Sequence, residues 1–368
     1  MSDIDSGDTA WVLASAALVL LMTPALAIFY GGLVGERMII TTMYMSFISL
    51  SIITIEWSLI TYSLSFAKSA NPNVDPFVGS LAFGAFDSAD RVRPGTRVPE
   101  HAFFIFQLAF AAVTAAVVSG AVVGRVSYAA WCVFIALWHL FVYTPLARWV
   151  FYTGGFLSKL GVLDFAGGLV VEMNSGVSAF VLAAWVSWEV ARARPRQQFA
   201  ANGGESFLQD ADEEAGDEEF ASVPWSGGAF SREDRTPHNV PFVLLGAGLL
   251  FFGWLGFNSG SALSSGYLAS RAFVNTALAA ASGMAGIAVA EAFLKRSGGR
   301  WGVPSAVGCA TGVVVGLVAI TCVCFPACLD SRTARWPSSL NPSPPSPSPY
   351  LVRRAGQHAA TSPSTRPS

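Results

Sequence analysis

Six long stretches of this chain contain no aspartate, glutamate, lysine or arginine. They are mostly apolar and cover Thr9–Gly35, His101–Gly124, Val126–Ala147, Thr236–Ser270, Ala272–Ala290 and Trp301–Leu329. A helix needs about 20 predominantly apolar residues to cross a hydrocarbon core that is about 30 Å thick. The stretches have about that length or more, so the sequence predicts an all-α polytopic membrane protein.

Charge and composition exclude other classes of protein. Only 12% of the residues are charged, about half the share that is usual in a soluble domain. The sequence has no basic patch with interleaved aromatic residues, so we expect no nucleic-acid partner. The N-terminal "MSDIDSGDTA" has three aspartates and no lysine or arginine. Because a secretory signal begins with positive charge, we interpret the first apolar run as the first span.

Hydropathy predicts eight spans within a membrane domain that covers residues 1–329. Lysine and arginine near the span ends are more frequent in the links that lie inside when the N-terminus lies outside. This bias predicts an outer N-terminus. The spans are predicted at about 10–32, 38–65, 101–123, 127–146, 165–189, 240–260, 269–294 and 302–323.

Two segments have the composition of disordered chain. The link 190–239 contains "DADEEAGDEE", with seven acidic residues in ten, and such a block is normally solvated. It is predicted to be a disordered cytoplasmic loop, and a regulatory or partner-binding loop is the alternative. Residues 330–368 are rich in serine and proline and are predicted to be a disordered tail. A second interpretation is that this tail is not native coding sequence.

The cysteines do not form a recognisable metal-binding pattern. Four of the five, Cys309, Cys322, Cys324 and Cys328, lie in or just after the last apolar run, while Cys132 stands alone. No histidine accompanies them and their spacing fits no zinc site, so we expect no metal. The sequence also shows no nucleophile–base pair, phosphate-binding loop or cofactor motif. We expect neither an enzyme nor a cofactor.

The stretch "LDFAGGLVVEMNSG" places two carboxylates, Asp164 and Glu172, at the start of the fifth span. Asp164 precedes the apolar run, where a carboxylate can accept hydrogen bonds from the first turn of a helix. Eight residues along a helix separate the two acids, so that they can border one channel without stacking. Intramembrane acids mark ion or proton pathways by default, so Glu172 is predicted to face a wet cavity.

Two other spans carry aromatic and small residues that suit a cation pathway. Phe103, Phe106 and Phe110 form one stripe of the third span; it is either packing or a surface whose ring faces attract an ammonium-like cation. In the sixth span, Phe257 lies one turn from Ser261, whose oxygen can accept a hydrogen bond. Close helix packing is predicted for three glycines of that span, namely Gly253, Gly256 and Gly260.

Glu56 and His139 are the other ionisable residues placed at membrane depth. Glu56 is expected either to reach toward the interface or to pair with another helix. His139 is expected to form a hydrogen bond with a neighbouring helix.

Several motifs in order resemble the Amt/Mep/Rh ammonium transporter family. They are "MTPALAIFYGGLVGERM", "FQLAF", "LDFAGGLVVEMNSG", "PHNVPF", "GWLGFNSGSA" and "SRAFVNTALAA". The resemblance runs from about Trp11 to Ile320. It implies a homotrimer of channel-like subunits in a plasma membrane. Each subunit of that family has eleven spans, built from two five-helix inverted repeats and a final helix.

The resemblance also implies a set of site residues. Phe106, Phe110, Tyr152 and Ser261 would form an outer site for ammonium or methylammonium, with Tyr152 in place of the tryptophan of many members. Phe110 and Phe257 would form the pore gate. Asp164 would hold the outer vestibule together. Glu172 stands where many members have the first of two pore histidines, as in a subset of fungal-type members, and would accept a proton.

The resemblance ends before the last three spans of the family, and with them the second pore histidine. We therefore expect about eight of the eleven spans. The expected function is transmembrane transport of ammonium or methylammonium, with ammonia crossing an apolar pore after deprotonation. Two alternatives stand beside it: an ammonium sensor that signals through its acidic loop, and a truncated, non-functional fragment.

Overall fold

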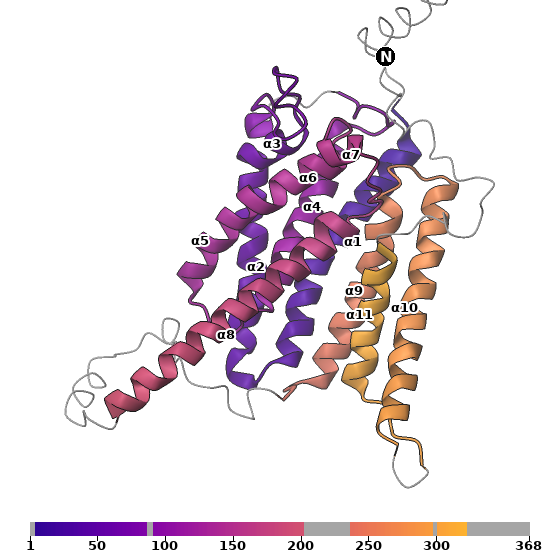
Figure 1. Cartoon of the computed structure of the whole chain (residues 1–368). Coiled ribbons are helices and arrows are strands. Elements are labelled where there is room, and N and C mark those ends of the chain that lie inside the picture. Colours follow the sequence, from indigo (N-terminus) through magenta and orange to yellow (C-terminus); the bar gives the residue numbers. More distant parts are fainter. Residues whose placement is uncertain (1–3, 87–90, 202–235, 297–299, 322–368) are drawn as a thin grey trace, which may run out of the picture. The chain divides into compact units, whose positions relative to one another are not determined.

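Helices make up the regular structure of the chain wherever the computed structural model describes it, at residues 4–86, 91–201, 236–296 and 300–321. Seven helical stretches in these residues are long and apolar enough to cross a membrane. An eighth, α11 (Ala306–Thr321), is apolar but shorter. The eight stretches follow the order of the predicted spans (Figure 1).

Several spans consist of more than one helical element. Three short segments, η2, η4 and η5, are π-helical, while η1 and η3 are 3₁₀ turns. The elements before η5 are α1 (Ser6–Leu33), η1 (Glu36–Met38), α2 (Ile39–Glu56), η2 (Trp57–Thr61), α3 (Tyr62–Phe66), η3 (Gly84–Phe86), α4 (Glu100–Ser119), α5 (Tyr128–Trp138), η4 (His139–Tyr143), α6 (Thr144–Phe151) and α7 (Phe156–Lys159). The remainder are η5 (Gly168–Met173), α8 (Asn174–Ala201), α9 (Val240–Gly260), α10 (Tyr267–Leu294) and α11.

Helices α1 and α9 pack closely because glycines of α9 face α1. A methyl group added at Gly246 would lie 2.5 Å from the backbone nitrogen of Phe29, and one at Gly256 would lie 2.7 Å from Cβ of Leu18. Gly253 likewise leaves no room for a methyl group beside Met22. Since lipid supplies little hydrophobic drive between helices, close backbone approach is a main source of helix association in membranes. The predicted role of these glycines is confirmed.

The same principle joins α10 to α11. Methyl groups at Gly283 or Gly316 would clash with backbone atoms of the facing helix. Trp254 of α9 donates a hydrogen bond of 2.9 Å to the hydroxyl of Thr321 in α11. Helices α9, α10 and α11 therefore form one packed group, as Figure 1 shows at the orange and yellow end of the sequence.

Buried apolar side chains gather in two clusters on opposite sides of α4. The first cluster joins α4 to α1 and α9, and it contains Phe106, Phe110 and Phe257. The second joins α4 to α2, α3, α5 and α6, and it contains Trp57 and Tyr143. Helix α4 is buried along most of its length, because both clusters draw on its side chains.

Three helix boundaries differ from the predicted span boundaries. The fourth span continues through η4 and α6 to Phe151 rather than ending near residue 146. Helix α8 continues to Ala201, so residues 190–201 are helical and not part of the predicted loop; alanine, arginine and glutamine in this segment are good helix formers. The fifth span begins at Gly168, not directly after Asp164. The acidic block and the serine/proline-rich tail lie outside the described residues.

A cluster of charged side chains ties the segment before α4 to α3 and to the N-terminal end of α4. Oε1 of Glu100, the first residue of α4, lies 3.3 Å from Nη2 of Arg91 and 3.3 Å from Nη1 of Arg93. The hydroxyl of Tyr62 in α3 donates to the same carboxylate. The arginines also cover aromatic rings, with Cζ of Arg93 4.0 Å from the ring centroid of Phe103. Arg93 and Glu100, the two buried members, form an ion pair, which allows these charges to be buried, whereas the Arg91 side chain stays partly exposed.

Candidate functional site

Three phenylalanine rings from two distant helices meet in the first hydrophobic cluster. The rings of Phe110 in α4 and Phe257 in α9 stack with centroids 4.1 Å apart and an interplanar angle of 10°. Phe106, one turn before Phe110, contacts it with centroids 4.8 Å apart. All three rings are 0–1% exposed. The sequence placed Phe103, Phe106 and Phe110 on one stripe. Phe103 belongs instead to the second hydrophobic cluster, and the fold brings the ring of Phe257 to the other two.

Glycines allow other segments to approach these rings. A methyl group at Gly260 of α9 would lie 2.9 Å from Cε2 of Phe106. Gly167, in the turn before η5, lies beside Phe110; a methyl group there would be 3.6 Å from Cδ1 of that ring. The three rings are thus enclosed by α4, α9 and the start of the fifth span.

Asp164 anchors the turn that leads into η5. Its Oδ1 accepts from the backbone N–H of Gly167 at 2.8 Å, and its Oδ2 accepts from Leu169 and Val170 at 3.0 Å each. Burial raises the pKa of this carboxyl above its ordinary value, although the N–H donors act in the opposite direction. The predicted helix-capping role of Asp164 is confirmed by these bonds.

The path from Asp164 to Glu172 is not one regular helix. Gly167 has a φ of 96°, a left-handed conformation that favours glycine. The π-helical segment η5 follows, and Glu172 lies within it with a half-buried side chain. The expected angular relationship between the two acids, which assumed a continuous helix, was therefore wrong. Short π-helical segments occur frequently at functional sites.

Ser261 lies directly after α9, one turn from Phe257. Its hydroxyl donates to the carbonyl of Phe257 at 2.8 Å. A serine hydroxyl has one donor and two acceptor lone pairs. Because the donor is engaged, the oxygen is left to act as an acceptor beside the stacked rings. The side chain is half-buried, so it is accessible at the edge of the phenylalanine cluster.

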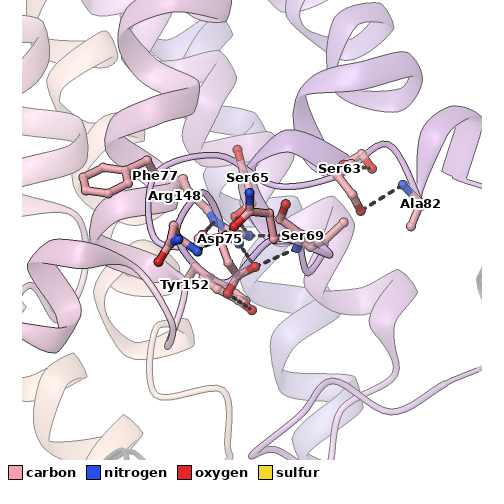
Figure 2. A network of polar contacts seen from close by, with 12 residues as sticks. Ser63, Ser65, Ser69, Asp75, Phe77, Ala82, Arg148 and Tyr152 are labelled. Carbon is pink, nitrogen blue, oxygen red and sulfur yellow. Dashed lines mark hydrogen bonds and ion pairs between the residues drawn. The ribbon is translucent and has the colours of Figure 1, made fainter.

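Tyr152 lies in a different environment from the three phenylalanines. Cζ of Arg148 is 3.5 Å from the centroid of the Tyr152 ring, and the Tyr152 hydroxyl donates to Oδ2 of Asp75 at 3.3 Å. Figure 2 shows these three residues in one polar network. The sequence analysis gave no role to Arg148 or Asp75. The available signal was Arg148 itself, a single charge at the end of the long apolar stretch Val126–Ala147.

Glu56 and His139 form a pair between two helical spans. Nδ1 of His139 lies 2.8 Å from Oε2 of Glu56. Glu56 ends α2 and His139 begins η4, so each residue adjoins a π-helical segment. His139 is completely buried, and the Glu56 side chain is 24% exposed. The expected hydrogen bond from His139 to another helix is confirmed, and its partner is Glu56.

The chain matches the model of the Ammonium Transporter Family over residues 10–200 and 226–327. It is 38% identical to a putative ammonium transporter of Methanothermobacter thermautotrophicus, over 86% of this chain and 66% of the relative. It is 37% identical to an ammonium transporter of Mycobacterium tuberculosis, over 87% and 62% of the two chains.

The fold is shared with a solved member of the family. The crystal structure of Saccharomyces cerevisiae Mep2 superposes with a TM-score of 0.68 at 29% identity, covering 88% of this chain and 64% of Mep2. The chain thus spans a little under two thirds of the length of these relatives. The matched family model, the apolar helices and the shared fold agree with one another. The chain is a multi-pass membrane protein that belongs to the ammonium transporter family.

Proposed function

We propose that this chain transports ammonium or methylammonium across a membrane. The observation that carries the proposal is the stack of Phe110 on Phe257 beside the Asp164 turn, from which η5 leads to Glu172. A closed aromatic pair next to a carboxylate at membrane depth is what a pathway for a small cation requires. Substrate recruitment, gating and deprotonation each then have a candidate group.

In this proposal, the faces of the phenylalanine rings and the Ser261 hydroxyl bind the incoming ammonium ion. The quadrupole of a phenylalanine ring attracts a desolvated cation by about 2 kcal/mol. The free acceptor lone pairs of Ser261 can take a hydrogen bond from an ammonium N–H. The hydrogen bond to Ser261 favours the ammonium ion over an alkali cation of one charge, because only ammonium can donate a directed hydrogen bond.

Passage requires the gate to separate and the cation to lose a proton. A charged ion in an apolar passage is expensive, whereas neutral ammonia is not. Glu172 is the proposed proton acceptor, since it is a half-buried carboxylate in η5, at the start of the fifth span. Ammonium would give one proton to Glu172, ammonia would continue, and the proton would leave by polar groups of the pathway.

We extend the proposal to the orientation, the membrane and the oligomeric state of the chain. Lysine and arginine near the span ends favour an outer N-terminus, and the membrane that we propose is the plasma membrane. The resemblance to the family favours a homotrimer. The chain's membership of a transporter family also favours transport over enzymatic catalysis.

A sensor role is the alternative from another class. It requires the acidic segment of the link 190–239 to report occupancy to a cytoplasmic partner, and that segment lies outside the described residues. The match to the model of a transporter family favours transport over this alternative. Deletion of residues 205–235 separates the two functions: the sensor hypothesis predicts a growth or signalling phenotype with uptake unchanged, whereas transport alone predicts no such phenotype.

The test is uptake of labelled methylammonium by the 368-residue chain in a host that lacks its own ammonium transporters, with surface expression measured in parallel. The Glu172→Ala variant should lose at least nine tenths of the uptake rate. Glu189→Ala, which removes an exposed carboxylate from the same helix, is the matched control and should retain it. Surface-expressed wild-type chain without uptake would contradict the proposal and favour the non-functional fragment.

A further inference from the structure

Arg148 is a completely buried cation whose donors are all engaged inside the protein. Its Nε and Nη2 donate to the carbonyl of Asp75 at 3.0 and 2.7 Å, and Nη2 also donates to Oδ1 of Asp75 at 2.8 Å. Its Nη1 donates to the carbonyls of Ser65 and Ala67 at 3.1 and 2.8 Å. These bonds use all five donors of the guanidinium. Arg148 therefore joins the end of α3 to the loop that follows it (Figure 2).

The loop is held by further bonds to the same carboxylate. The backbone N–H of Ser69 donates to Oδ1 of Asp75 at 2.6 Å. Trp149 donates from its indole to the carbonyl of Phe77 at 3.0 Å. The loop after α3 is thus fastened to α6 at several points, with Arg148 and Asp75 at the centre of the network.

The ring of Tyr152 is part of this network. Arg148 lies one turn before it and places Cζ 3.5 Å from the ring centroid, a distance typical of a strong cation–π contact. The Tyr152 hydroxyl donates to the second oxygen of Asp75. Gly154 crowds the ring from the next turn, where a methyl group would clash with Cε1. Only part of this half-buried ring is left for another ligand.

We propose that the guanidinium of Arg148 is a built-in cation that occupies a face of the Tyr152 ring. This tyrosine then positions the loop after α3 and does not recruit the substrate. The inference rests on the proposed function and refines its outer site. A ring that already binds one cation attracts a second one weakly, because the first cation polarises the π electrons toward itself and repels another positive charge. Recruitment then depends on Phe106, Phe110 and Ser261, which contact the gate or belong to it.

The experiment compares Tyr152→Trp, Tyr152→Phe and Tyr152→Leu in the full chain, by the KM and maximal rate of methylammonium uptake and by the unfolding temperature in detergent. Tryptophan is the stronger cation–π partner and leucine has no ring. We expect KM within twofold of wild type for all three. The unfolding temperature should fall in the order tryptophan or tyrosine, phenylalanine, leucine. Tyr267→Leu, at an exposed residue, is the control and should change neither quantity.

Two outcomes would overturn the inference. One is a KM that falls at least threefold in Tyr152→Trp and rises at least tenfold in Tyr152→Leu, which would show that the ring binds the substrate. The other is an unfolding temperature that is equal in Tyr152→Phe and Tyr152→Leu, which would show that the ring does not hold Arg148. Absence of uptake by the wild-type chain would contradict the proposed function instead, and the order of unfolding temperatures would still decide whether Tyr152 is engaged by Arg148.

Discussion

The ring centroids of Phe110 and Phe257 lie 4.1 Å apart and the rings stack face to face, although the two residues belong to helices that are far apart in sequence, α4 and α9. Both side chains are buried, so the stack closes the space between α4 and α9 at that level. A pathway that runs there must separate the rings. The stack is therefore the structural feature on which transport most directly depends.

Replacing either ring should change transport more than folding. In Phe257→Leu and Phe110→Leu, the aromatic pair is lost, which removes about 0.5–1.5 kcal/mol beyond the loss of buried area. We expect a lower unfolding temperature and a change of at least threefold in the KM or rate of methylammonium uptake. Kinetics in cells and thermal unfolding of purified chain measure the two effects.

Phe103→Leu is the control for this prediction. Phe103 is also buried on α4, but it belongs to the second hydrophobic cluster and contacts Arg93. It should lower the unfolding temperature and leave KM unchanged. Equal KM values in Phe103→Leu, Phe110→Leu and Phe257→Leu would refute a gate at the stacked pair.

Replacing Asp164 with asparagine should destabilise the protein less than replacing it with alanine. Asp164→Ala leaves three backbone N–H groups of the η5 turn without their acceptor, which costs about 1–3 kcal/mol for each buried donor that finds no new partner. Asp164→Asn keeps one acceptor oxygen. We expect the unfolding temperature to decrease from wild type to asparagine to alanine. An alanine variant as stable as wild type would mean that the carboxylate does not hold this turn.

Gly167→Ala should destabilise the same turn by a different mechanism. The residue has a positive φ, and its added methyl group would lie 2.7 Å from Cγ2 of Val171. Alanine in this conformation costs roughly 1–2 kcal/mol before the clash is counted. Gly176→Ala provides the matched control, because it lies in α8 with open space around it and should be neutral or stabilising by up to about 1 kcal/mol. Chemical or thermal unfolding in detergent would separate the two, and equal stabilities would contradict the strain.

Substitutions of Glu56 and His139 should have strongly non-additive effects on the free energy of unfolding. Glu56→Leu leaves a buried imidazole without its partner, and His139→Leu leaves a carboxylate at membrane depth. Each single change should cost roughly 1–3 kcal/mol, with His139→Leu the more severe. The double variant should be close to wild type, since replacing both members of a buried pair by apolar groups is often neutral. A double variant whose loss equals the sum of the single losses would show that the two residues act independently.

The membrane spans were predictable because apolar length is a property of each segment alone. Each of the six charge-free stretches covers the apolar part of a different one of the eight helical stretches, and the glycines of the sixth span indicated close packing before any partner was known. The motifs and their order can likewise be read from the sequence without knowledge of any tertiary contact. It led to the family that the comparisons establish.

Errors arose where local patterns compete. The start of the fifth span was placed at residue 165 because the residues after Asp164 are apolar, but Gly167 adopts a left-handed conformation and delays the helix to Gly168. The π-helical segments beside Glu56 and His139 also leave no periodicity that a sequence pattern can detect. Their geometry depends on packing against neighbouring spans.

The sequence by itself determined the class of protein, the order of the spans and the candidate groups Phe106, Phe110, Asp164, Glu172, Phe257 and Ser261. The tertiary structure decided which of these groups meet. It stacked Phe257 on Phe110, paired Glu56 with His139 and placed Arg148 on Tyr152. Hydropathy acts residue by residue and can be summed along a chain. A ring stack or an ion pair between helices depends on the relative position of segments far apart in sequence, which only their packing sets.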